Sequence, residues 1–199
     1  MTDQSHIHSY VEQAKNRLDE IDASVAHFEA RAQDVQADAR AKADAAIAKM
    51  KANRDAYRAW VAENQEIGEL ITAEARKDLE GEWAKFEDNV MAYFDAAAGI
   101  YEQDKAYFQV RIEALKDAWE NTMERVRKSA KTFRTSSEAE VDAAVAKLEK
   151  NAEIANAKLK DLNAAGNASW AAVRDALSAS RAAFDKALDE TQSAFKEAL

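Results

Sequence analysis

Residues 92–108, AYFDAAAGIYEQDKAYF, contain the triplet Ala-Tyr-Phe twice, fourteen residues apart. Each copy places two large rings next to each other, Tyr93 with Phe94 and Tyr107 with Phe108. Neighbouring residues on an α-helix point about 100° apart, so a single flat contact cannot bury both rings. The stretch therefore predicts a helix whose apolar face is wide enough for two neighbours.

The composition of the chain indicates an all-α protein. Its 199 residues include no proline, no cysteine and only four glycines, and 33% of them are charged. Proline costs roughly 3 kcal/mol and glycine roughly 1 kcal/mol inside a helix, so this composition is typical of long helices. Four Trp, seven Phe and five Tyr supply more aromatic surface than disordered chains usually carry. We expect a single elongated helical domain over residues 1–199.

The apolar residues follow helical spacing along most of the chain. Near the N-terminus they alternate in steps of three and four, which is a heptad pattern: Val11, Ala14, Leu18, Ile21, Val25, Phe28, Ala32, Val35 and Ala39. After this point the steps change, and later the spacing is elevenfold, as in Leu79, Val90, Tyr101, Ile112 and Met123. Elevenfold stripes stay nearly straight whereas heptads supercoil to the left, so the mixture predicts long helices with little net supercoil.

Two polar interruptions divide this pattern into three segments of similar length. Residues 63–69, ENQEIGE, and residues 134–140, RTSSEAE, contain residue types that end or cap helices. The sequence therefore predicts an elongated antiparallel three-helix coiled-coil bundle, with helices at about 3–64, 67–134 and 136–199. At 1.5 Å per residue, such helices form a rod about 90–100 Å long. The apolar pattern runs in phase through Gly166, where we expect a kink or a local fray.

Charge supports both turns. A hairpin at the first turn places the basic residues 40–58 beside the mostly acidic residues 74–88. A hairpin at the second turn places a basic patch beside Glu138, Glu140 and Asp142. The basic patch consists of Arg125, Arg127, Lys128, Lys131 and Arg134. It could contact phosphate or acidic lipid, but we favour a cation-rich helix C-terminus that faces an acidic neighbour.

The middle segment carries nine of the sixteen aromatic residues. The expected core includes Trp83, Phe94, Phe108, Trp119, Phe184 and Leu188. The rings exceed what one facing stripe can cover, so the sequence predicts a homodimer in which the same face serves both subunits. The residues expected at this interface are Trp83, Tyr93, Phe94, Tyr101, Tyr107, Phe108 and Trp119.

The sequence offers no recognisable catalytic or cofactor motif. It contains no Gly-rich phosphate loop, no Gly-x-Ser-x-Gly and no His-Glu-x-x-His. Its histidines are His6 and His8, which we assign to a solvated terminus rather than to a metal site, and His27, which we place on a helix flank. We expect no enzymatic activity, no cofactor and no bound metal. The net charge of −9 argues against nucleic-acid binding, which needs a positive face.

The elevenfold amphipathic spacing resembles that of exchangeable apolipoproteins and, more loosely, that of bacterial phasins that coat polyester granules. The expected helix lengths are similar to those of membrane-shaping BAR domains. The resemblance is one of periodicity and composition over most of the chain, and it implies reversible binding to a lipid or polymer surface. The acidic charge and the many alanines of the outer helices count against it, because alanine buries little area for anchoring.

Two functions therefore stand side by side. The first is a non-enzymatic structural or protein-interaction protein, a long helical coiled coil that self-associates. The second is an amphipathic coat protein for lipid or polymer surfaces. The N-terminus shows no basic region followed by an apolar run, and no stretch approaches the roughly 20 apolar residues of a membrane span. We expect a cytoplasmic protein.

Overall fold

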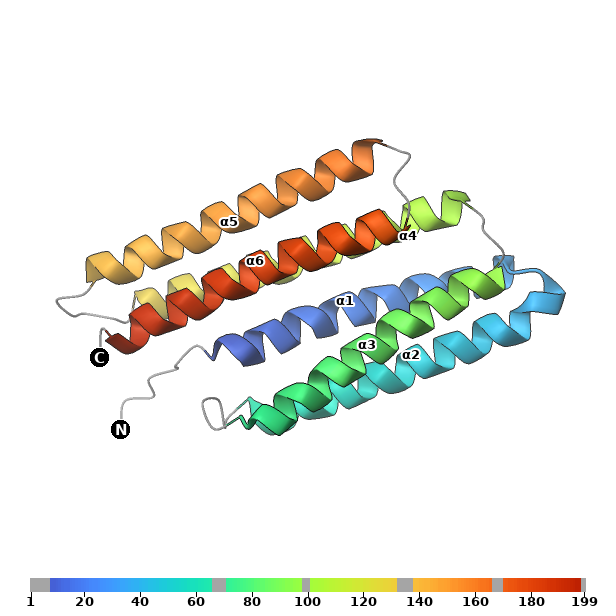
Figure 1. Cartoon of the computed structure of the whole chain (residues 1–199), viewed down its shortest axis with the longest axis horizontal. Helices are drawn as coiled ribbons and strands as arrows, with labels where there is room; N and C mark the ends of the chain where they lie inside the picture. The colour runs from blue at the N-terminus through green and yellow to red at the C-terminus, as the bar shows by residue number, and fades with distance from the viewer. Residues whose placement is uncertain (1–7, 66–70, 98–100, 132–137, 166–169, 198–199) are drawn as a thin grey trace. The chain divides into compact units, whose positions relative to one another are not determined.

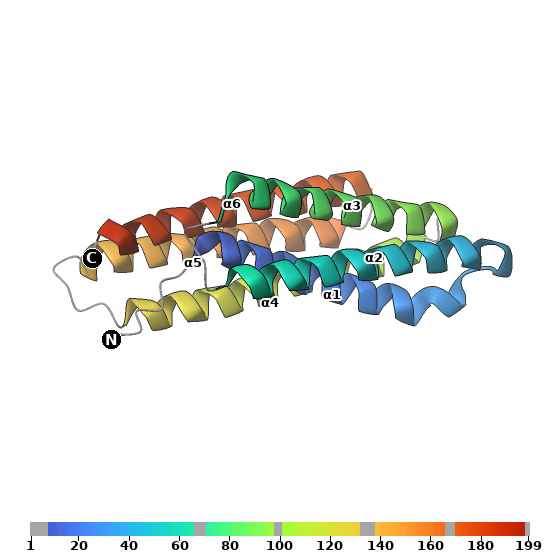
Figure 2. The ribbon, with the colours of Figure 1, turned by 90° about the horizontal axis from the view of Figure 1, so that it is seen from below.

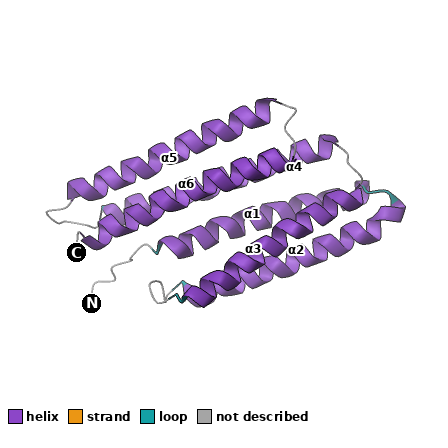
Figure 3. Cartoon of the chain, in the orientation of Figure 1, coloured by secondary structure: helices purple, strands orange, loops and turns teal. Residues whose placement is uncertain are grey.

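The computed structural model describes residues 8–65, 71–97, 101–131, 138–165 and 170–197, and these residues are almost entirely helical (Figures 1 and 3). The α-helices of this part of the chain are α1 (Ser9–Arg31), α2 (Ala37–Asn64), α3 (Ala73–Ala97), α4 (Tyr101–Ala130), α5 (Glu138–Ala165) and α6 (Trp170–Glu197). No strand occurs among the described residues. The predicted all-α class is confirmed.

The helices belong to two compact units. Residues 14–115 form one of them, which we call the 14–115 unit, and it holds most of α1, all of α2 and α3, and the first half of α4. Residues 1–13 and 116–199 form the other, the 116–199 unit, with the first turn of α1, the second half of α4, α5 and α6. Two helices, α1 and α4, thus contribute residues to both units.

The helix expected over residues 3–64 is interrupted at its centre. A short 3-10 helix, η1 (Ala32–Asp34), follows α1, and Val35 is extended with ψ at 135°. Val35 is buried, and Arg40 donates hydrogen bonds to the carbonyl oxygens of Gln33 (2.6 Å) and Val35 (3.2 Å). The chain can therefore turn without Gly or Pro, because a buried valine anchors the turn and one arginine satisfies two of its carbonyl groups.

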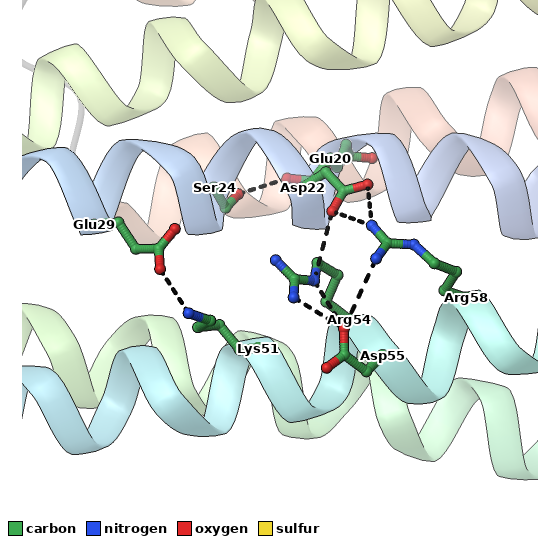
Figure 4. Close-up of polar contacts among 8 residues, drawn as sticks. All are labelled: Glu20, Asp22, Ser24, Glu29, Lys51, Arg54, Asp55 and Arg58. Atoms are coloured by element: carbon green, nitrogen blue, oxygen red, sulfur yellow. Dashed lines mark hydrogen bonds and ion pairs between the residues drawn. The ribbon is translucent and has the colours of Figure 1, made fainter.

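The first predicted turn is confirmed, since α2 ends before α3 begins and the two helices pack side by side in opposite directions (Figures 1 and 2). The expected charge pairing differs, because the basic side chains of α2 reach acidic side chains on α1. Lys51 lies 2.8 Å from Glu29, and Arg58 lies 2.9 Å from Asp22 (Figure 4). Glu29 and Asp22 of α1 thus pair with basic side chains of α2 that we expected to face acidic residues of α3.

The helix expected over residues 67–134 is also divided. The Arg111 guanidinium of α4 lies 2.8 Å from the Glu87 carboxylate of α3. In one continuous helix, residues 24 positions apart would be separated by about 36 Å. The chain therefore reverses direction between α3 and α4. Gly99, the glycine nearest to this reversal in the sequence, lies outside the described residues.

The third expected helix, residues 136–199, forms two helices rather than one kinked helix. α5 and α6 pack side by side, Lys147 lies 2.5 Å from Glu190, and the Thr191 hydroxyl oxygen lies 3.4 Å from the Ala144 carbonyl oxygen. Gly166 lies outside the described residues. The apolar pattern continues through this turn because both helices need an inward apolar face, so the pattern alone cannot reveal the reversal. The break near residues 134–140 is confirmed, although its expected capping residues also lie outside the described part.

The double rings of residues 92–108 pack inside the 14–115 unit. Phe28 of α1 lies at their centre, with ring centroids at 4.2 Å from Tyr93, 4.6 Å from Tyr107 and 5.7 Å from Phe94. Phe94 and Tyr107 also meet edge to face at 5.4 Å. Three of the four rings thus converge from α3 and α4 on a single phenylalanine of α1, an arrangement of the kind that aromatic pairs prefer.

The expected core is confirmed at four of its six positions. Phe108, Trp119, Phe184 and Leu188 are buried, whereas Trp83 and Phe94 are only half-buried. In the 116–199 unit, Trp119 of α4 stacks on Phe184 of α6 with 4.7 Å between ring centroids and an interplanar angle of 10°. Phe94 contacts the rings of Phe28, Tyr93 and Tyr107, whereas Trp83 lies outside this cluster and contacts the rings of Tyr57 and Phe86.

We predict that Phe28→Ala lowers the free energy of unfolding by roughly 3–5 kcal/mol, because it leaves a cavity lined by three rings. Phe94→Ala is the matched control and should cost less, since its ring is half-buried. Urea unfolding followed by circular dichroism measures both. Equal losses in the two variants would show that Phe28 is not the centre of the cluster.

Candidate functional site

A buried ion cluster joins three helices of the 14–115 unit. Arg111 of α4 is fully buried, and its Nη2 atom lies 2.9 Å from Glu20 Oε2 on α1 and 2.8 Å from Glu87 Oε1 on α3. The Glu20 side chain is also fully buried, while 16% of the Glu87 side chain is exposed. An arginine can hold two carboxylates because its guanidinium presents five donors in a fixed plane.

Aromatic rings enclose this guanidinium. Its central carbon lies 5.5 Å from the Trp83 ring, 5.7 Å from the Phe86 ring and 5.9 Å from the Tyr107 ring. Cation–π attraction within about 6 Å strengthens when the cation is removed from water. The Tyr107 hydroxyl donates to Ser24 Oγ at 3.2 Å, and Ser24 in turn donates to the Glu20 backbone carbonyl at 2.7 Å.

Arg111 and Tyr107 keep their protonation states near neutral pH. Burial alone would lower the pKa of Arg111, but the neighbouring Tyr107, Glu87 and Glu20 groups hold that pKa well above its ordinary value. Burial raises the pKa of the Tyr107 hydroxyl to about 12. A permanently protonated guanidinium and a neutral phenol supply no group that exchanges protons at pH 7. The contacts of Arg111 and Tyr107 therefore align α1, α3 and α4.

A second polar cluster ties the first turn of α1 to α6 within the 116–199 unit. The Ser9 backbone N–H donates to Gln192 Oε1 at 3.1 Å, which satisfies one of the N–H groups that a helix start leaves open. The Ser9 hydroxyl lies 2.5 Å from Asp189 Oδ1 and 2.6 Å from Gln192 Oε1, and it can donate to one of these at a time. Gln13 donates to Asp189 Oδ1 at 3.0 Å.

The basic patch lies at the C-terminal end of α4, and its two leading arginines are paired. Arg125 Nε donates to Glu12 Oε2 at 2.7 Å, and Arg127 Nε donates to Glu149 Oε1 at 2.6 Å. Lys128 and Lys131 are exposed, and Arg134 lies outside the described residues. The acidic partners of these two arginines are thus Glu12 and Glu149. The side chains of Glu138 and Glu140, which the sequence analysis expected beside the patch, lie outside the described part.

The aromatic residues expected at a dimer interface lie mostly inside the chain itself. Tyr93, Tyr107, Phe108 and Trp119 are buried, and the Tyr101 side chain is outside the described part. The half-buried Trp83 lies 5.6 Å from the Arg17 guanidinium and 6.4 Å from the Tyr57 ring. The wide apolar face that we expected to contact a second subunit therefore packs, for the most part, against other helices of the same chain.

The outer face of α2 is a feature that the sequence reasoning missed. The buried residues of α2 lie on one side of the helix, and its exposed alanines lie on the opposite side. These alanines are Ala37, Ala41, Ala45, Ala48, Ala52, Ala56, Ala59 and Ala62. Most recur at intervals of eleven residues, so they form a nearly straight stripe, which we call the α2 alanine face. The spacing of the alanines is visible in the sequence, but only their exposure in the structure distinguishes the outward-facing alanines from the inward-facing ones.

A groove borders the α2 alanine face. It lies between α2 and α3 and has a volume of about 370 Å³. Ala45, Ala46, Ala92 and Ala96 form its apolar lining, and Lys42, Lys49 and Asp95 form its charged lining. Small side chains on both helices thus leave a groove on the α3 side of α2.

A second groove, of about 510 Å³, lies between α4 and α5 in the 116–199 unit. Glu120, Glu124 and Glu153 give it an acidic character, and Arg127 at its edge already pairs with Glu149. No group of three or more metal-ligating side chains occurs among the described residues. Within the same part of the chain, no helix is long and apolar enough to cross a membrane.

These features define an all-helical protein with polar clusters that connect its helices and a flat alanine face on one of them. No protein-family model, curated protein or solved structure matches the chain.

We predict that Arg111→Met lowers the free energy of unfolding by roughly 3–5 kcal/mol, because it leaves Glu20 buried without its cation. Arg58→Met, which removes the exposed pair with Asp22, is the matched control and should cost about 0–1 kcal/mol. Adding Glu20→Gln to Arg111→Met should recover part of the loss. Urea unfolding provides the measurement, and an Arg111→Met loss no larger than that of the control would contradict the proposed role of the cluster.

His27 should make the fold sensitive to mild acid. Burial and the nearby Arg31 lower the pKa of His27 below its ordinary value. Between the lowered folded-state pKa and the unfolded value near 6.5, the unfolded chain binds more protons. Stability should therefore fall as the pH drops below about 6.5, and His27→Gln should reduce that fall. Thermal unfolding at a series of pH values tests this, and identical pH profiles of the two proteins would refute it.

Proposed function

We propose that this chain is a structural or protein-interaction protein that self-associates through an exposed helix face. The observation that carries the proposal is the α2 alanine face, which lies opposite the buried side of the same helix. Alanine side chains allow two helices to approach to about 8 Å, the close end of the usual range. A flat face of this kind suits another helix.

Helix propensity alone does not account for these alanines. Alanine is the best helix former, but the alanines of α4, a helix of 30 residues, are all buried or half-buried. From residue 105 onward, the exposed positions of α4 are occupied by charged or amide side chains. The outer surface of α2 thus differs from that of α4, although α5 and α6 also expose alanines at several positions.

A coat function on lipid or polymer surfaces is the competing proposal. Among the described residues, Ile154 is the exposed large apolar side chain, with 45% of its surface accessible. Binding to such a surface would require the aromatic residues that now surround Phe28 to become exposed. The self-association proposal needs no such rearrangement.

Sedimentation equilibrium tests the proposed function. The chain has a mass of 22.1 kDa, and we expect a reversible monomer–dimer equilibrium over about 1–300 µM, because an interface formed by small side chains is of the weak class. Monomer alone throughout this range would contradict self-association. In that case, co-sedimentation with lipid vesicles and a simultaneous gain of helix would support the coat function instead.

A further inference from the structure

We draw no further inference here: the strongest candidate, the acidic groove between α4 and α5 that Glu120, Glu124 and Glu153 line, is a cluster of carboxylates, and nothing in the described part of the structure shows what occupies it.

Discussion

The buried pairing of Arg111 with Glu20 and Glu87 is the constraint on which the 14–115 unit depends. Taking these charges out of water is costly, and the cost is offset only when the hydrogen bonds have good geometry. A shift of α1 or α3 by one turn would move a carboxylate about 5.4 Å and leave the guanidinium without its partner. The cluster therefore penalises wrong alignments of the three helices more strongly than apolar contacts alone would.

The aromatic layer around Phe28 follows from this alignment. Glu20 and Phe28 lie two turns apart on the same helix, so fixing Glu20 against Arg111 also fixes the level at which Phe28 meets Tyr107. Large apolar surfaces give most of the stabilising free energy, but many ring arrangements bury similar areas. The ion cluster limits these alternatives, and the rings then fill the space that the alignment defines.

The sequence predicted the all-α class, because apolar spacing and the near absence of Gly and Pro act locally, but it did not predict where three of the helices end. It failed where the deciding interactions join distant residues. The turn at Val35 has no glycine or proline, and its stability comes from a buried side chain and the hydrogen bonds of Arg40. From the sequence pattern alone, an arginine at position 111 is expected at the surface. Its burial is possible because it pairs with Glu20 and Glu87, which lie far away in the sequence. For the same reason the sequence did not reveal that most of the aromatic residues expected at a dimer interface are buried within the chain.

The same logic explains why the outer faces of the helices are the place to look for function. The interior charges and rings are engaged with one another, so a binding partner must meet the surface. Most surface positions of a helix tolerate charged residues, as α4 shows, and charge also favours solubility. The exposed alanines on the outer side of α2 lack the charge that favours solubility. The proposed close approach of a second helix would give a physical reason for the stripe, because alanines let two helices pack near the lower limit of their usual separation.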